Sequence, residues 1–94
     1  MIEWTEQATR QLDQAHDYIA LSNSEEVADR ITERILGSVQ QLAAFPMSGC
    51  AGRVPGTREL VIANTPFMAA YAIEKVRIVV LAVCHGAQRW PERV

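Results

Sequence analysis

The chain has 94 residues, of which 49% are hydrophobic and 21% are charged, and this composition is typical of one small globular domain rather than a disordered chain. Eleven acidic and nine basic residues give a net charge of −2. This balance argues against a protein that grips a nucleic-acid backbone over a long track, because such domains usually carry a strong basic excess. Two cysteines are too few for a disulfide framework or for a zinc site built from thiolates alone. We expect neither a metal nor a cofactor.

The sequence predicts a single cytoplasmic domain over residues 1–94. Its first four residues, Met-Ile-Glu-Trp, lack the basic and then apolar stretches of a signal peptide. No apolar run reaches the roughly 18 residues that a membrane-spanning helix needs, so no membrane partner is expected. Cys50 and Cys84 are therefore expected to be reduced and unpaired.

The charges divide the chain into an acidic and a basic half. Residues 1–49 hold eight acids and three arginines, a net of −5, whereas residues 50–94 hold six bases and three acids, a net of +3. Two solvated faces of unequal sign would explain this division as well as a binding surface would. If a surface for an anionic partner exists, the second half carries it.

Two amphipathic helices are predicted in the first half. The first runs from Glu6 to about Leu21, with apolar residues at helical spacing behind an N-capping threonine. Residues 22–24, Ser-Asn-Ser, interrupt this pattern and offer a new cap. A stripe of branched apolar residues then predicts a second helix that ends near Ala44. Gly37 inside the second helix predicts tight helix packing at that point. The short connection predicts an antiparallel helical hairpin.

The second half is predicted to be a loop followed by strands. The loop, over residues 46–56, is rich in glycine and proline, and the strands cover residues 57–63, 67–74 and 76–84. Their short connections force neighbouring strands to be antiparallel, and the almost unbroken apolar run of the third predicts the central strand, buried on both faces. A further edge strand is predicted over residues 1–4. The expected fold is α+β, with an N-terminal antiparallel helical hairpin packed on an antiparallel β-sheet of three to four strands.

Four side chains could carry chemistry, but none defines a reaction. His85 directly follows the predicted central strand, and its ordinary pKa near 6.5 suits proton transfer at neutral pH, although a histidine that satisfies loop carbonyls is the structural alternative. Tyr71 is predicted to be a half-buried aromatic residue whose role is structural. Arg53 and Arg58 could each hold a phosphate or a carboxylate, yet an exposed arginine usually does neither.

Two runs of residues carry a family resemblance. They are G-R-V-P-G-T-R-E-L over residues 52–60 and H-G-A-Q-R-W-P over residues 85–91, supported by N-T-P-F at 64–67 and A-Y at 70–71. Together they resemble the RelE/ParE superfamily of toxins, over nearly the whole chain. The resemblance implies a helical hairpin on an antiparallel sheet. It also implies a toxin of a type II toxin–antitoxin operon, neutralised by a cognate antitoxin bound directly to it in a hetero-oligomer.

Two mechanisms compete within that superfamily. RelE-like members cleave mRNA on the ribosome, where side chains on the sheet stabilise the charge that develops on the phosphate. ParE-like members do not use that nuclease site and inhibit DNA gyrase. The two runs are closer to ParE-like proteins, and the single lysine and negative net charge favour the same interpretation. Relatives often carry arginines at positions that appear here as Ala72 and Ala82.

The resemblance therefore implies a ParE-like gyrase inhibitor. The alternatives are a RelE-like, ribosome-dependent mRNA endonuclease and an inactive toxin homologue that retains only antitoxin binding. His85, Arg58 and Tyr71 fall where ribonucleolytic relatives place working groups, so they are catalytic candidates only under the endonuclease alternative. An acidic or amphipathic antitoxin segment is expected to contact the basic half. The expected partner-binding residues are Arg53, Arg58, Arg77, Arg89, Trp90 and Arg93.

Overall fold

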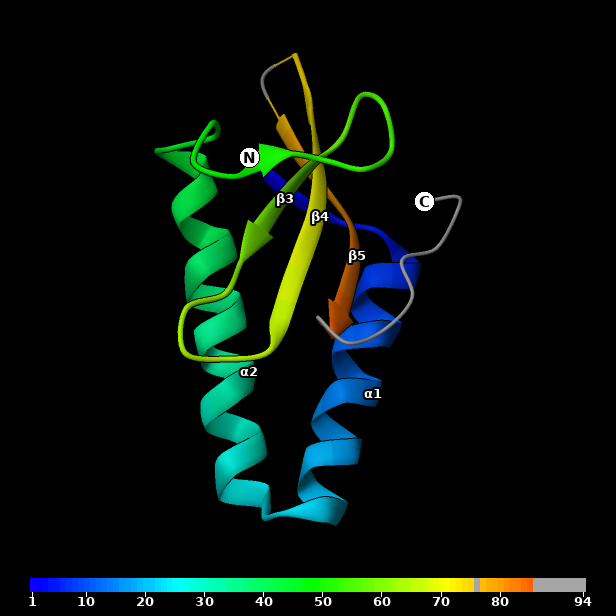
Figure 1. Ribbon diagram of the computed structural model, residues 1–94, viewed down its shortest axis with the longest axis vertical. Helices are drawn as coiled ribbons and strands as arrows, with labels where there is room; N and C mark the ends of the chain where they lie inside the picture. The colour runs from blue at the N-terminus through cyan, green and yellow to red at the C-terminus, as the bar shows by residue number, and fades with distance from the viewer. Residues whose placement is uncertain (76, 86–94) are drawn as a thin grey trace.

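A helical hairpin lies against one face of a five-stranded sheet in the computed structural model, which describes residues 1–75 and 77–85 (Figure 1). In chain order the elements are β1 (Ile2–Trp4), α1 (Glu6–Ser22), α2 (Glu25–Gln40), the short 3₁₀ helix η1 (Gln41–Ala43), β2 (Cys50–Ala51), β3 (Arg58–Val61), β4 (Phe67–Glu74) and β5 (Arg77–His85). The strand order across the sheet is β1-β5-β4-β3-β2. The predicted α+β class, with its N-terminal hairpin on the sheet, is confirmed.

The sheet differs from the prediction in strand number and in direction. It has five strands rather than three to four, because Cys50–Ala51 in the predicted loop pairs with β3. The sheet is also mixed, since β1 pairs with β5 in parallel. The chain between β1 and β5 is long, as a parallel pair requires, and contains the helical hairpin followed by β2, β3 and β4. The last strand is not central: β4 takes that place, and β5 lies between β4 and β1. A continuous apolar run indicates only that a strand lies inside the sheet, so it cannot distinguish the central position from the position beside it.

Both helices begin at the hydroxyl caps that the sequence indicates. Thr5 Oγ1 accepts the Ala8 N–H, and Ser24 Oγ accepts the Val27 N–H, each at 3.1 Å. Acidic residues occupy both first turns, where they complement the helix dipole. The later part of the stripe on α2 and η1 is buried, with Ile35, Val39 and Leu42 each no more than 1% exposed, whereas Val27 and Ile31 near the start of α2 are half-buried. These residues join a core that includes the helix-side residues of β4 and β5.

Gly37 does not mark tight helix packing, and that prediction was wrong. The residue is exposed, and a Cβ built on it would meet no atom within 4 Å. The apolar stripe of α2 faces the core on the other side of the helix. Gly37 is therefore an ordinary solvent-facing position, where glycine lowers helix propensity without any packing benefit.

A bulge in β5 decides which of its side chains face the helices. Ala70 pairs with Ala82 and Tyr71 pairs with Val80, so Leu81 is an extra residue with no partner in β4. The alternation along β5 shifts by one residue there. Val80 and Val83 consequently both belong to the core beneath the helices. Beyond the bulge, odd-numbered residues face the helices, and this places His85 on that side.

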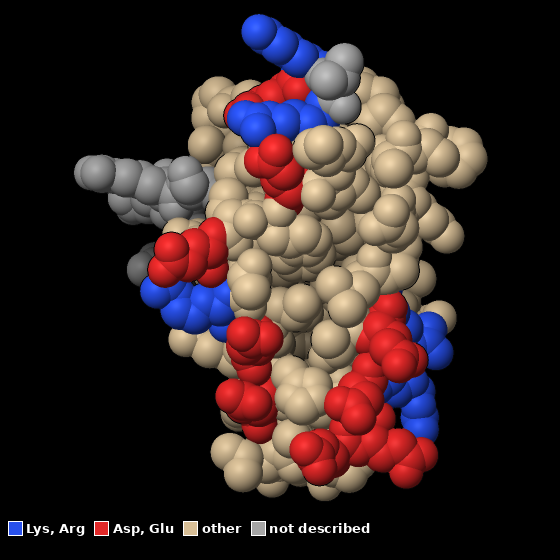
Figure 2. All heavy atoms as spheres, turned by 180° about the vertical axis from the view of Figure 1, so that it is seen from behind, with Lys and Arg blue, Asp and Glu red and all other residues tan. Residues whose placement is uncertain are grey.

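The helical side of the molecule is acidic. Residues 6–44 contain seven acidic and three basic residues, a net of −4. Figure 2, which views the molecule from the helical side, shows acidic side chains gathered along the helices. Neither helix in the described part of the chain is long and apolar enough to cross a membrane.

Candidate functional site

Arg58 and Tyr71 form a clamp on the loop between η1 and β2. The two residues are direct neighbours across β3 and β4. Tyr71 donates its hydroxyl proton to the Pro46 carbonyl at 2.7 Å and accepts the Gly49 N–H at 3.1 Å. Arg58 Nη2 donates to the Met47 carbonyl at 3.1 Å and also to the Gly49 carbonyl. Four backbone groups of the loop thus bind two side chains of the sheet.

The clamp leaves no room for a side chain at Gly49. A Cβ at this position would lie 2.7 Å from both the Glu59 carbonyl oxygen and the Tyr71 hydroxyl. Tyr71 itself is completely buried. Arg58 Nε is also buried, without a hydrogen-bond partner, so the clamp has an energetic cost at that atom. The physical role of both side chains is to hold the loop against the sheet.

His85 lies away from the clamp. It pairs with Phe67, four residues before Tyr71 along β4, which corresponds to roughly 13 Å along the sheet. Its ring packs edge-on against the Phe67 ring, with the centroids 5.4 Å apart and the planes at 81°. Of the three catalytic candidates, the structure brings Arg58 and Tyr71 together and leaves His85 at the other end of the strand. Their role in the endonuclease alternative stays a prediction.

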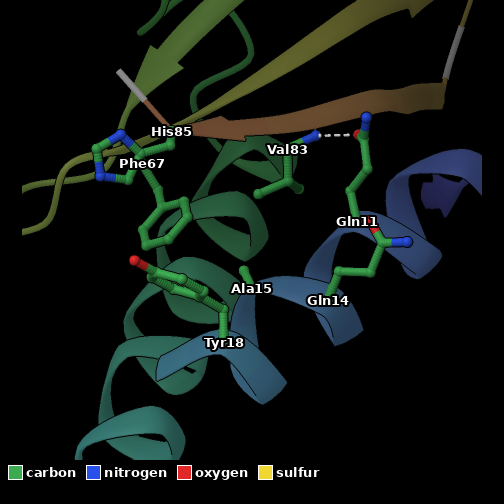
Figure 3. Close-up of a pocket in the computed structure, with 7 residues that line it drawn as sticks. All are labelled: Gln11, Gln14, Ala15, Tyr18, Phe67, Val83 and His85. Atoms are coloured by element: carbon green, nitrogen blue, oxygen red, sulfur yellow. Dashed lines mark hydrogen bonds between the residues drawn. The ribbon is translucent and has the colours of Figure 1, made fainter. Parts of the chain in front are cut away.

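An open pocket of about 470 Å³ lies between α1 and the ends of β4 and β5 (Figure 3). Its lining residues are Gln11, Gln14, Ala15, Tyr18, Phe67, Val83 and His85. Gln11 Oε1 accepts the Val83 N–H at 2.8 Å and so ties α1 to the outer edge of β5. In Figure 3, Tyr18 extends toward Phe67. The pocket combines aromatic rings with two amides, which suits peptide contact better than phosphate binding.

Two more arginines of the predicted partner surface are described. Arg77 Nη1 donates to both carboxylate oxygens of Glu3 at 2.9 Å, and its Nη2 donates to Glu74 at 3.0 Å. These carboxylates raise the pKa of Arg77 and compensate its charge. Arg53 is exposed, and its backbone N–H donates to Glu59 at 3.0 Å. The remaining partner candidates, Arg89, Trp90 and Arg93, lie outside the described residues.

The two alanines that replace expected arginines lie on β4 and β5. Ala82 is buried beside Ala70 and Cys84 on the sheet face away from the helices, and Ala72 follows two residues after Ala70 on β4. Neither can supply positive charge to the sheet. Among the described residues, no group of three or more histidine, cysteine or acidic side chains could hold a metal ion.

Sequence reasoning missed the pocket and the clamp. Gln11, Gln14 and Tyr18 form no recognisable motif, because only the packing of α1 against β5 brings them beside His85. The helical spacing of these three residues was the one available signal, and amphipathic helices commonly show the same spacing. The loop contributes only backbone atoms to the clamp, and no pattern of side chains in the sequence predicts where these atoms lie.

The fold and these contacts define a small α+β protein with a helical hairpin on a mixed sheet and two candidate contact regions, the clamp and the pocket. The family model described as ParE toxin of type II toxin–antitoxin system, parDE, matches residues 2–90. A protein of Sinorhizobium fredii (strain NBRC 101917 / NGR234), named as a candidate toxin, Y4kP, is 40% identical over 91 residues, covering 97% of this chain and 93% of that protein.

A solved structure also resembles this chain in its fold. Its title is the chromosomal ParDE TA system from P. aeruginosa, and it matches with a TM-score of 0.82 and 27% identity over 89% of this chain and 92% of that one. The chain therefore belongs to the ParE toxin family of type II toxin–antitoxin systems. The predicted superfamily, and its ParE-like branch, are confirmed.

Proposed function

We propose that this ParE-family toxin inhibits DNA gyrase in the cytoplasm and is neutralised by an antitoxin that binds directly to it. The proposal rests on the family and on one observation about the site. Tyr71, which an mRNA endonuclease would use, commits its hydroxyl to the loop over residues 46–49, and Arg58 donates from one nitrogen, Nη2, to two carbonyl oxygens of the same loop. A buried tyrosine hydroxyl with two backbone partners is not available to an RNA substrate.

The charge of the chain supports the same choice. A nuclease that works on the ribosome faces dense phosphate and gains affinity from a basic surface. This chain has a net charge of −2, and its helical hairpin, residues 6–44, has a net charge of −4. Binding to a protein target does not require a basic surface. The endonuclease reading is thereby disfavoured on electrostatic grounds.

The proposal is tested by running a gyrase supercoiling assay beside a translation-coupled mRNA cleavage assay with the purified toxin. We expect inhibition of supercoiling, no ribosome-dependent cleavage, and relief of the inhibition by the product of the small open reading frame beside the toxin gene. His85→Ala should change gyrase inhibition only modestly, because no proton transfer by the toxin is involved.

The opposite pattern would support the endonuclease. In that case the toxin cleaves mRNA, and His85→Ala lowers the rate by roughly 10²–10⁴-fold, the usual effect of losing general acid–base help. Antitoxin binding without either activity would identify an inactive homologue. Each outcome contradicts the gyrase proposal in a different assay.

We assign part of the antitoxin contact to the basic half of the chain. Both exposed described candidates form ion pairs, Arg53 with Glu59 at 3.8 Å and Arg77 with Glu3 at 2.9 Å and Glu74 at 3.0 Å. Arg53 is the stronger candidate, because the carboxylates around Arg77 lie closer to its guanidinium. Arg53→Glu is therefore expected to weaken the antitoxin complex more than Arg77→Glu does, when both are compared by titration calorimetry.

A further inference from the structure

Two large apolar side chains stand out from the clamped loop. Phe45 is 65% exposed and Met47 is 64% exposed, and they flank Pro46 just after η1. Single exposed apolar residues are common on protein surfaces. Here the two residues lie one on each side of a single proline, on a loop that is hydrogen-bonded to the sheet. Their positions are therefore set before any partner binds.

The loop is held in place by hydrogen bonds on both of its sides. Phe45 N–H donates to the Gln41 carbonyl at 2.9 Å, which continues the helical end, and Ser48 N–H donates to the Phe45 carbonyl at 3.1 Å. The second bond closes a turn with Pro46 at its second position, where the fixed φ of proline is favoured. Tyr71 and Arg58 then bind the carbonyls of Pro46 and Met47. A protein surface fixed in this way loses little conformational entropy on binding.

The charge beside the apolar pair is positive. Arg58 donates to two neutral carbonyl oxygens, and within residues 1–75 and 77–85 no carboxylate forms an ion pair with it. The acidic residues of the hairpin lie elsewhere, along the helices. In Figure 1 the loop follows the end of α2 that is far from the hairpin turn. An acidic segment is therefore attracted to the loop and repelled by the helices, whose region carries a net charge of −4.

We propose that Phe45, Met47 and the Arg58 guanidinium form a docking surface for a segment of the cognate antitoxin that carries large apolar side chains and a carboxylate. This inference rests on the proposed function, since it assumes that the antitoxin binds the toxin directly. The apolar pair supplies the buried contact, and Arg58 supplies the charge that selects an acidic segment. Tyr71 is a positioning residue for this surface.

The test uses the toxin and the antitoxin encoded beside it, purified and mixed, with affinity measured by biolayer interferometry. The double variant Phe45→Ala/Met47→Ala is expected to weaken binding by at least about 30-fold, the effect of losing an interface hot spot. The matched control is Tyr18→Ala/Leu21→Ala, which removes two side chains on α1 that are 71% and 90% exposed. This control should change affinity by less than about threefold. Added NaCl should weaken the wild-type complex, because salt screens the Arg58 attraction.

The outcomes separate this inference from the proposed function. If the wild-type proteins form no complex, the proposed function itself fails. If the complex forms and the Phe45/Met47 variant binds as tightly as the wild type, the inference is overturned. A larger loss of affinity in the Tyr18→Ala/Leu21→Ala control would place the docking site at the pocket beside α1, and it would also overturn the inference. Loss of gyrase inhibition with unchanged antitoxin binding would assign the apolar pair to the target instead. Equal thermal melting of both variants excludes unfolding as the cause.

Discussion

At the scale of single residues, two side chains with catalytic potential turn out to serve the backbone. Arg58 can bind phosphate and Tyr71 can transfer a proton, and the sequence alone offers no way to choose between these roles and a structural one. The structure adds the burial and the hydrogen-bond partners of both side chains, which support the structural role. Tyr71 is completely buried, and its hydroxyl has one acceptor and one donor within 3.1 Å.

Replacing Tyr71 by phenylalanine tests this structural role. The variant keeps the ring in the core but leaves the buried Gly49 N–H and the Pro46 carbonyl without their partner. Because an unsatisfied buried donor costs about 1–3 kcal/mol, we expect the free energy of unfolding to fall by that amount in urea titrations.

Tyr18→Phe is the matched control for that measurement. The Tyr18 side chain is 71% exposed, so loss of its hydroxyl should change stability by less than about 0.5 kcal/mol. Equal stability of the two variants would show that the Tyr71 hydrogen bonds contribute nothing net.

At the scale of elements, one histidine joins the two helices near their acidic surface. His16 Nε2 on α1 lies 2.7 Å from Asp29 Oδ1 on α2, and His16 Nδ1 lies 3.7 Å from Asp17 Oδ1. The hydrogen bond to Asp29 is the main cause that raises the pKa of His16 above its ordinary 6.5, and the charges of both carboxylates add to it. The protonated form therefore links the helices best.

The pH dependence of stability follows from that shift. Because the folded-state pKa is raised, the contribution of His16 is fully present below about pH 6.5 and is lost as the pH rises through the folded-state value. We expect the stability difference between wild type and His16→Ala to shrink as the pH rises above about 6.5 in urea titrations. A difference that does not change as the pH rises above about 6.5 would show that protonation of His16 does not stabilise the hairpin.

At the scale of the whole molecule, the sheet separates the two cysteines. Cys50 lies on the edge strand β2 and is exposed, whereas Cys84 is buried on β5. The three strand spacings between them amount to roughly 14 Å, too far for a disulfide. Burial, followed by the charge of Glu59, raises the pKa of Cys84 to about 11. Both thiols are free, as the sequence predicts.

Alkylation should therefore distinguish the two thiols. Iodoacetamide at pH 8 is expected to modify Cys50 in the native protein and to modify Cys84 only after denaturation, because the thiolate is the reactive form and Cys84 is both buried and protonated. Mass spectrometry of tryptic peptides gives the site. Cys50→Ser provides the control, and rapid native labelling of Cys84 in that variant would contradict the burial.

Part of the site could be predicted from the sequence, because some of its features depend on residues close together along the chain and others on residues far apart. The sequence predicted His85 at the end of a strand and placed Arg58 and Tyr71 on two neighbouring strands, because short turns connect these strands; their direct pairing came from the register in the structure. The clamp could not be predicted, because its partners are backbone atoms of a loop whose path no side-chain pattern encodes. Phe45 and Met47 flank Pro46 where the predicted second helix ends and the predicted loop begins, and no motif marks either residue.

The sequence by itself determined the two helices, their hydroxyl caps, the three strands of the second half and, through its motifs, the toxin superfamily. These features depend on neighbours along the chain: periodicity over a few turns, capping within three residues, and short turns between strands. The tertiary structure alone decided the parallel pairing of β1 with β5, the central place of β4, the bulge at Leu81 and the contacts of Arg58 and Tyr71 with the loop. Each of these depends on contacts between segments far apart in the chain, which local patterns do not record.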